Sequence, residues 1–554
     1  MVRRVLRFLY EYTLFIIVLY VGYIVWAQVF QLAVVDYLNT TLWCRRGVWI
    51  GNSSIDLFDF TVTYQMEGYG DYSFFYVHWG YNMLNGVMPY SPDFGRLEMD
   101  GILNQNGLYI FPPLYAVLYA IGIMIPVDDY GIGIILAAFG YLTVFPVYGI
   151  AQQLSGNRHV GEAASITYLL NPSVLYHICF AWLNPSPFIF FFFLGFYAIT
   201  KGKRNTGALL IVTAALFKQT AWFLGIPLVI YLLLAPRRGL RRSSRGTRTE
   251  DAKLASNDSS SPVQSEPSNQ DEPESDKAHV EQKRLGALDG IFQPLKEYLD
   301  LKGFLVSAIV VVIYAGAVLF PFYLAQPDMF SYLSLAGGGF RLESFTEPPG
   351  YPSPMRLQVL AVMAGLPWLA EILDILVYYD FLLVFGVMIS AGLMLLQPKD
   401  MDHNRHYLRR LLFLTMIMML WVHLAGPRGV YKYYFTLFAP FFSIFSSVKM
   451  VTSKEERVGF SWSMLLVPVG MTLLYLLPSR NIYLLSVIFI IVGYLLAAQI
   501  GVFWSVVTSP GRWVKKMLWP HMTPVLNGYQ ALTAYVNRQL YPEAALVTTS
   551  AESR

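Results

Sequence analysis

Charged residues and cysteines are both scarce in this sequence. Only 14% of the 554 residues are charged, whereas 55% are hydrophobic, and the two cysteines are Cys44 and Cys179. Because so few charged side chains could not cover several soluble domains, an ordinary soluble protein is excluded and a membrane protein is indicated. Two cysteines exclude a disulfide-rich scaffold and a metal site built from several cysteines. The formal net charge of +4 gives no support to nucleic-acid binding, so we expect no nucleic-acid partner.

Long apolar stretches recur along the chain. A helix needs about 20 mainly apolar residues to cross a bilayer, and about twelve such stretches predict an all-α membrane protein, a polytopic bundle. The stretch 206–235 is counted once, although Lys218 in its middle leaves open whether it is one tilted span or two short ones. The predicted spans lie near residues 8–34, 107–126, 132–153, 162–179, 184–200, 206–235, 303–325, 372–396, 409–425, 431–449, 458–477 and 481–506.

Basic residues in the loops predict the direction of the spans. Arg3, Arg4 and Arg7 precede the first span, which puts the N-terminus in the cytoplasm by the positive-inside rule. Alternation then puts most other basic clusters on the same side. The cluster at 201–204 falls on the outer side instead, which suggests a misplaced boundary among the second to sixth spans. We expect a multi-pass protein of the cell membrane or the endoplasmic reticulum.

A charged, low-complexity segment divides the chain into two membrane modules. Its acidic half, at 256–276, has almost nothing to bury, so we expect a disordered cytoplasmic linker. Each module carries a long outer loop, and the first of these is expected to hold interfacial helices. The expected parts are a first module at 1–235 with its outer loop at 35–106, the linker at 236–302, a second module at 303–506 with an outer loop at 326–354, and a cytoplasmic tail at 507–554.

The first outer loop contains a predicted helix that begins at Asp71. In the run DYSFFYVHWGYNMLNGVMPY, apolar residues recur at helical spacing, as at Phe75, Trp79 and Met83, which predicts a helix lying on the membrane surface. Gly86, Pro89 and Tyr90 are expected to end this helix. An aspartate at a helix start commonly caps free backbone amides, so we expect Asp71 to cap this one, a role that is compatible with catalysis.

Three short motifs follow one another around this helix. Asp71 opens it, the sequence GVMPY follows at 86–90, and FPPLY follows at 111–115, at the mouth of the second predicted span. In this order, in and after a large outer loop, the motifs resemble the membrane glycosyltransferases of the C-type superfamily. The likeness is closest to the polyprenyl- or dolichyl-phosphate-mannose-dependent mannosyltransferases. It covers residues 1–235 well and the last third of the chain loosely.

The resemblance implies a reaction and its partners. Such enzymes move a sugar, here expected to be mannose, from a polyprenyl-phosphate donor to a hydroxyl on the outer or lumenal face, with inversion of the anomeric centre. The expected acceptor is a lipid-linked glycan, a glycolipid or a protein. No cofactor is expected, and a divalent metal is left open.

The reaction needs a carboxylate base near the membrane surface. By motif, Asp71 is the general base that deprotonates the acceptor hydroxyl. Asp36, just past the first predicted span, is the alternative base. The remaining carboxylate candidates are Asp56, Asp59, Glu67 and Asp100.

Basic residues near the outer ends of two late spans are the candidates for binding the donor phosphate. They are His423, Arg428 and Lys432, in WVHLAGPRGVYKYY. Cationic side chains there would neutralise the leaving phosphate, although Arg428 and Lys432 could instead only extend to the interface. His159 is also expected on the outer side. The residues expected to line the substrate cavity are His78, Trp79, Tyr90, Tyr115 and Lys218.

Two other functions stay open. A transporter or flippase of a lipid-linked sugar would use the same aromatic cavity without chemistry, and a non-catalytic scaffold would bind partners through the linker. Inverted repeats around a site at the membrane midplane would favour transport. An outward-facing groove beside Asp71 would favour sugar transfer.

Overall fold

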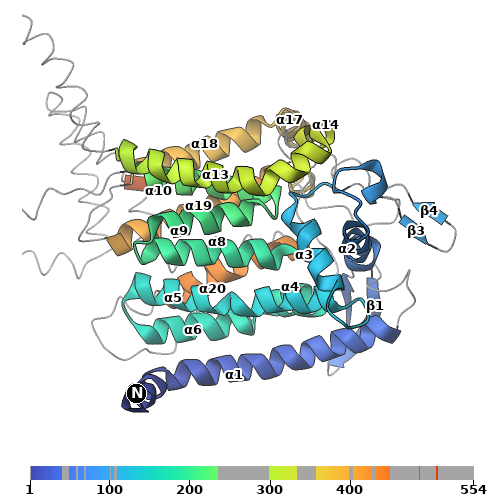
Figure 1. The fold of residues 1–554 in the computed structure, drawn as a ribbon, viewed down its shortest axis with the longest axis horizontal. Coiled ribbons are helices and arrows are strands. Elements are labelled where there is room, and N and C mark those ends of the chain that lie inside the picture. The colour runs from blue at the N-terminus through green and yellow to red at the C-terminus, as the bar shows by residue number, and fades with distance from the viewer. Residues whose placement is uncertain are drawn as a thin grey trace, which may run out of the picture.

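The long apolar stretches form helices that lie side by side in a layered bundle (Figure 1). The computed structural model describes residues 2–39, 49–57, 60–67, 70–95, 97–99, 102–104, 109–234, 299–332, 357–397, 404–426, 431–448, 486 and 507–508. Side-chain surroundings are described from Tyr10 on, outside the strands.

The described elements of the first half are mainly helices, with four short strands before the third helix. They are α1 (Val2–Asn39), β1 (Trp49–Leu57), β2 (Phe60–Glu67), η1 (Tyr72–Tyr76), α2 (Val77–Leu84), η2 (Pro92–Gly95), β3 (Leu97–Met99), β4 (Ile102–Asn104), α3 (Leu114–Ile123), α4 (Gly131–Leu142), α5 (Val144–Ser155), α6 (Arg158–Leu169), α7 (Pro172–Val174), η3 (Leu175–Phe180), α8 (Pro185–Thr200), α9 (Arg204–Ala215), η4 (Gln219–Leu224) and α10 (Gly225–Leu233).

The described elements of the second half are all helical. They are α13 (Leu301–Ala325), α14 (Pro327–Phe330), α16 (Leu357–Met363), α17 (Pro367–Tyr378), α18 (Phe381–Leu395), α19 (Asn404–Ala425), η6 (Lys432–Leu437) and α20 (Phe438–Val448).

Four described helical stretches are long and apolar enough to cross a bilayer: Tyr10–Asn39, Gly131–Ser155, Leu301–Ala325 and Arg405–Ala425. The pair α17–α18, bent by 75°, would make a fifth. Three further apolar helices are shorter. The chain is therefore a largely helical membrane protein. The expected spans at 458–477 and, apart from residue 486, at 481–506 lie outside the described residues, so the count of twelve stays a prediction.

The bundle has two chemically different ends. At one end, Arg158 at the start of α6 donates a 2.7 Å hydrogen bond to the carbonyl of Glu11 near the start of α1. The basic residues 201–204, between α8 and α9, lie at this same end (Figure 1), which we call the basic end. The opposite end, which we call the loop end, carries α2, α3 and the strands.

The helix α3 corrects the predicted second span. It has ten residues and so is about 15 Å long, half of the hydrocarbon thickness. Figure 1 shows it running across the loop end of the bundle rather than along it. The span expected over 107–126 is therefore wrong. This stretch is apolar because α3 is packed against other protein: Tyr115, Leu118 and Tyr119 are all buried.

The segment 206–235 forms two helical runs of opposite direction, which favours the second of the two alternatives that the sequence left open. The helix α9 runs to the loop end, where the carbonyl of Leu216 accepts a 3.3 Å hydrogen bond from the amide of Leu114, and η4–α10 runs back (Figure 1). The chain turns at Lys218, whose backbone is extended (φ −145°, ψ 135°). Without a pass over 107–126, the basic cluster at 201–204 lies on the side of the N-terminus, and two opposed runs over 206–235 return the next basic cluster, at 237–248, to the same side.

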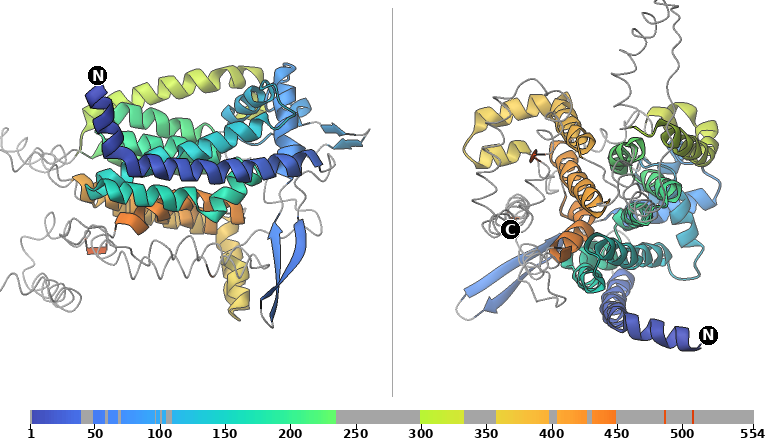
Figure 2. Two further views of the ribbon diagram at one scale, coloured as in Figure 1. Left: turned by 90° about the horizontal axis from the view of Figure 1, so that it is seen from below. Right: turned by 90° about the vertical axis from the view of Figure 1, so that its left-hand side faces the viewer.

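The loop end contains β-strands that the sequence analysis did not predict. Strands β1 and β2 pair antiparallel from Trp49↔Glu67 to Leu57↔Phe60, and β3 pairs with β4. The β1–β2 hairpin projects away from the bundle (Figure 2). Its second strand, FTVTYQME, alternates apolar and polar residues, which is the strand signal that was overlooked.

One apolar core joins the two predicted membrane modules. Buried residues from Phe15 in α1 to Phe445 in α20 form a single cluster. Close approaches tighten it: a Cβ atom on Gly133 of α4 would lie 2.5 Å from the ring of Trp182, so only glycine fits there. Seen from the basic end, most helices of this core run toward the viewer (Figure 2).

The two modules also meet where the linker leaves and returns. Leu234 and Leu299 form an antiparallel bridge, and the amide of Asp300 donates a 2.8 Å hydrogen bond to the carbonyl of Leu233. The second module begins at Leu301 of α13, slightly before the predicted boundary at 303. The predicted linker lies outside the described residues apart from its last part.

Candidate functional site

Asp71 stands at the start of η1, at the loop end, and is half-buried. Its backbone is helical (φ −52°, ψ −36°), and its carboxylate makes no capping hydrogen bond to the amides of this described helix. The predicted capping role is therefore wrong. Helix capping does not explain why an aspartate stands at this position, which leaves a chemical role open to it.

The side chain of Tyr76 connects Asp71 with the bundle. Tyr76 is buried, and burial raises the pKa of its phenol well above the usual value. The neighbouring Tyr119, Asp71 and Tyr433 raise that pKa further. The carboxylate of Asp71 and the ring of Tyr433 therefore lie within electrostatic reach of the same phenol, although they are far apart in the sequence.

A stack of aromatic rings holds η1 and α2 on the bundle. The rings of Tyr76 and Tyr119 are stacked at 4.7 Å, and those of Tyr119 and Tyr115 at 5.6 Å. Trp79 stacks on Phe75 at 5.2 Å. The hydroxyl of Tyr115 donates a hydrogen bond to a backbone carbonyl of the loop before α8. Two residues predicted to line the substrate cavity, Trp79 and Tyr115, are thus buried and position the helix that carries Asp71.

Two buried aromatic residues near this helix have a left-handed backbone. Tyr90 has a φ of 74° and Trp182 a φ of 51°. The hydroxyl of Tyr90 donates a 2.7 Å hydrogen bond to the carbonyl of Phe111, and Trp182 packs against Tyr72 at 5.0 Å. Bulky residues rarely adopt this conformation, and such strain persists where surrounding contacts enforce it, often at functional sites.

Four basic side chains from four separate elements gather in the core, and we call them the cationic cluster. They are His177 of η3, Lys218 between α9 and η4, His423 of α19 and Lys432 of η6. All four are buried, with exposed fractions of 0%, 5%, 7% and 1% in that order. Electrostatic interactions link Lys432 with His177 and Lys218 with His423.

Aromatic rings enclose the cationic cluster. The ammonium of Lys218 lies 5.0 Å from the ring centroid of Tyr434, 5.6 Å from that of Tyr433 and 5.7 Å from that of Phe188. Such cation–π contacts stabilise an ammonium group in an apolar setting. The ring of His423 also packs against Tyr434, at 5.3 Å.

The position of the cationic cluster favours an anionic ligand. Burying an ammonium group costs roughly several kcal/mol, so buried lysines are rare. Ionisable residues inside a membrane protein are therefore functional candidates by default. Two buried lysines with two histidines beside them would bind a phosphate well.

Tyr433 relates the cationic cluster to Asp71 through the phenol of Tyr76. Its ring contacts the ammonium of Lys218, lies 6.2 Å from the ring of His177, and is in electrostatic reach of Tyr76 beside Asp71. The site thus combines a carboxylate at the loop end with buried cations. This is the pairing that transfer from a phosphate-linked donor needs: a base for the acceptor and positive charge for the leaving phosphate.

The other residues predicted for the site, the alternative base Asp36 and the cavity residue His78, lie outside the cationic cluster. Asp36 is half-buried in the last part of α1, which is longer than the predicted span, and the next residue, Tyr37, packs on Tyr72 of η1 at 5.5 Å. His78 of α2 is half-buried. Burial lowers its pKa, while the carboxylate of Asp129 opposes this shift.

His159 corrects another prediction. It lies at the basic end, in α6, where its Nδ1 atom is 2.6 Å from the carboxylate of Glu162. It was expected on the outer side because the predicted span over 107–126 inverted the direction of the following helix. Arg428 and the side chains of Asp56, Asp59, Glu67 and Asp100 lie outside the described residues.

His177 belongs to the site and was missed. It stands in the apolar run LYHICF, inside the span predicted at 162–179. A signal was present, because an ionisable residue in the middle of an apolar span is a functional candidate. Its proximity to Lys432 could not be read from the sequence, since the two residues lie in separate elements far apart along the chain.

Within the part of the chain that the structure describes, there is no group of three or more His, Cys, Asp or Glu side chains that could hold a metal ion. Comparison with known proteins found no family model and no curated protein that matches this chain. The geometry of the site and the motif resemblance therefore carry the functional argument.

Proposed function

We propose that this membrane protein is a glycosyltransferase that moves a sugar from a polyprenyl-phosphate donor to an acceptor hydroxyl at the loop end. The observation that carries the proposal is that Asp71 and Tyr433 both lie within electrostatic range of the Tyr76 phenol, while the ring of Tyr433 contacts Lys218 of the cationic cluster. Mannose is the sugar that the motif resemblance favours. By the positive-inside rule, the loop end is the outer or lumenal face.

In the proposed reaction, Asp71 accepts the proton of the acceptor hydroxyl as its oxygen attacks the anomeric carbon. The bond between that carbon and the phosphate oxygen breaks on the opposite face, so the anomeric configuration inverts. The phosphate leaves with the bonding electron pair. Lys218 and Lys432 stabilise its developing negative charge, and His177 adds a hydrogen-bond donor, whereas the Nδ1 atom of His423 already donates to the carbonyl of Met419.

The exposed apolar surface of the bundle supports a lipid-linked donor. Val312 and Ile313 of α13 are 68% and 66% exposed, and Phe385 and Met388 of α18 are 64% and 67% exposed. Such side chains suit contact with acyl or polyprenyl chains. A donor held in the bilayer would therefore bring its phosphate to the protein from the side.

The proposal is tested by sugar transfer with purified protein in lipid, using radiolabelled polyprenyl-phosphate mannose and membrane acceptors. Asp71→Asn should lower turnover by about 10²- to 10⁴-fold, the usual contribution of a general base. Asp36→Asn is the matched control, because Asp36 is the alternative base, and it should keep most of the activity. Full activity of Asp71→Asn would refute the assignment of the base. Donor binding without transfer by the wild type to any acceptor would instead favour a transporter or flippase.

A further inference from the structure

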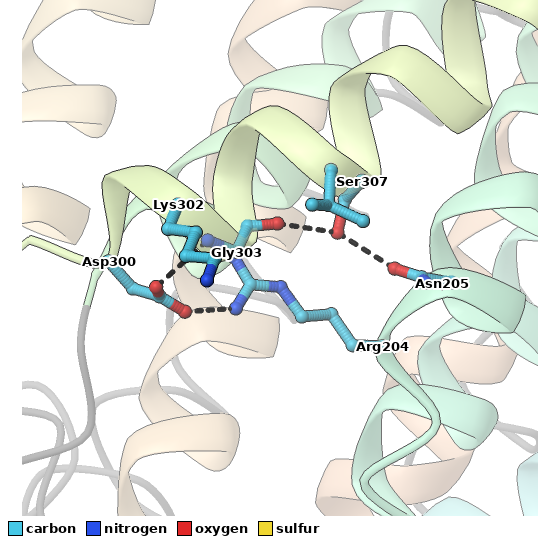
Figure 3. Close-up of a pocket in the computed structure, with 7 residues that line it drawn as sticks. Arg204, Asn205, Asp300, Lys302, Gly303 and Ser307 are labelled. Carbon is cyan, nitrogen blue, oxygen red and sulfur yellow. Dashed lines mark hydrogen bonds and ion pairs between the residues drawn. The ribbon is translucent and has the colours of Figure 1, made fainter.

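A pocket at the basic end, opposite the proposed active site, has no role in sugar transfer. It lies between the starts of α9 and α13 and has a volume of about 490 Å³ (Figure 3), which is within the size range of small-molecule sites. Its lining residues are Arg204, Asn205, Asp300, Lys302, Gly303, Val306 and Ser307.

The polar wall of the pocket is held by its own hydrogen bonds. The guanidinium of Arg204 reaches from α9 to the carboxylate of Asp300 (Figure 3). It also donates to the carbonyl of Leu232. The second oxygen of Asp300 accepts a 3.0 Å hydrogen bond from the amide of Gly303. The hydroxyl of Ser307 lies 2.8 Å from the side-chain oxygen of Asn205. The wall therefore exists before any ligand arrives.

The charge of the pocket favours an anion. Arg204 and Asp300 form an ion pair and neutralise each other. Lys302 lines the same pocket, is exposed and adds one further positive charge. The N-terminal end of α13 also opens into the pocket, but its dipole is offset by Asp300, whose carboxylate accepts the hydrogen bond of the Gly303 amide. The net positive charge therefore comes from Lys302 and favours a ligand that carries a phosphate or another acidic group.

An apolar surface continues from the pocket along α13. Val306 forms part of the lining. Farther along the same helix, Ile309, Val312 and Ile313 are 58%, 68% and 66% exposed. An anion with fatty acyl chains would match both parts, because its head group would lie at Lys302 while its chains followed the side of α13.

We propose that this pocket binds the phosphate head group of an acidic phospholipid from the membrane leaflet at the basic end. A free phosphate would share the charge complementarity but would leave the apolar surface of α13 without a role. The site is independent of the proposed sugar transfer and stands even if that proposal fails.

The test is lipid retention by the purified full chain, measured by native mass spectrometry after exchange into detergent with phosphatidylglycerol or phosphatidylcholine. The wild type should retain phosphatidylglycerol and not phosphatidylcholine. Lys302→Glu should reduce retention by about tenfold or more, since each basic residue near an anionic lipid contributes on the order of 1 kcal/mol and the variant also adds a repulsive charge. Val306→Trp, which fills the pocket, should reduce it as well. Neither change replaces Arg204 or Asp300, so the ion pair between them is kept.

Lys201→Glu is the matched control, because Lys201 is exposed at the same end but does not line the pocket. It should retain lipid as the wild type does. Equal retention by Lys302→Glu and the wild type would refute the proposal. Binding of inorganic phosphate without retention of phosphatidylglycerol would also refute it, because a free anion would then be the ligand.

Discussion

Removing the charge of Lys432 should weaken use of the sugar donor specifically. The side chain is 1% exposed and belongs to a cluster in which it interacts with His177. In Lys432→Gln, the donor phosphate would lose one charged hydrogen bond, which is worth about 1.5–3 kcal/mol. That loss corresponds to a decrease of about 10- to 150-fold in kcat/KM for the donor.

The assay varies the concentration of labelled polyprenyl-phosphate mannose at a fixed, saturating concentration of acceptor. A transition-state contact to the leaving phosphate would lower kcat together with kcat/KM, whereas a contact made equally in the ground state would raise KM alone. Lys201→Gln, at the opposite end of the bundle, is the control for a general effect of losing a lysine.

A double-mutant cycle with Lys218→Gln tests whether the two lysines act on one ligand. Residues of one network are typically non-additive by about 0.5–3 kcal/mol, whereas distant residues are additive. We expect the double variant to lose less than the sum of the two single losses. Unchanged donor kinetics in Lys432→Gln, in protein that remains monodisperse, would refute the role of the cationic cluster in binding phosphate.

Two further predictions concern the fold. Gly133→Ala should destabilise the protein by about 1–3 kcal/mol, because the new Cβ would lie 2.5 Å from the ring of Trp182. Gly225→Ala is the control and should not destabilise it, because no atom lies within 4 Å of the new Cβ. The temperature at which half of each variant remains monodisperse in detergent measures the effect, and equal temperatures for the two variants would contradict the packing around Gly133. In a background without native cysteines, Lys201→Cys and Trp222→Cys should react with a membrane-impermeant maleimide from opposite sides of sealed vesicles, and labelling from one side would contradict two passes over 206–235.

The helix that carries Asp71 could be predicted because its information is local. Aromatic residues at helical spacing form η1 and α2, and the helix ends before Gly86, whose φ of 80° suits glycine. The capping role failed because a side-chain hydrogen bond depends on the rotamer of Asp71. Sequence pattern does not determine that rotamer.

The number and direction of the passes could be predicted only in part. Hydropathy indicates that a stretch is removed from water but not whether protein or lipid surrounds it. The helix α3 is removed from water because it packs across the end of the bundle, not because it crosses the membrane. Conversely, the break at Lys218 divides one apolar stretch into two helical runs of opposite direction. The basic cluster at 201–204 was the correct warning, because its charge preference is independent of hydropathy.

The cationic cluster illustrates why the site was harder to predict than the helices. Lys218, His423 and Lys432 were each proposed from local patterns, yet nothing in those patterns places them beside His177. Their association depends on how η3, α9, α19 and η6 pack, which is long-range information. Hydrophobic spacing alone does not contain it.

Because Leu234 and Leu299 form a bridge, the chain should tolerate insertions between these two residues. Because the chain leaves and re-enters the bundle at one point, with the amide of Asp300 bonded to the carbonyl of Leu233, the distance to be spanned is the same for a short or a long connection. Longer connections cost little additional closure entropy. Evolution could therefore change residues 235–298 in length and charge without rearranging the helices, and an engineer could place a fluorescent reporter there for the same reason.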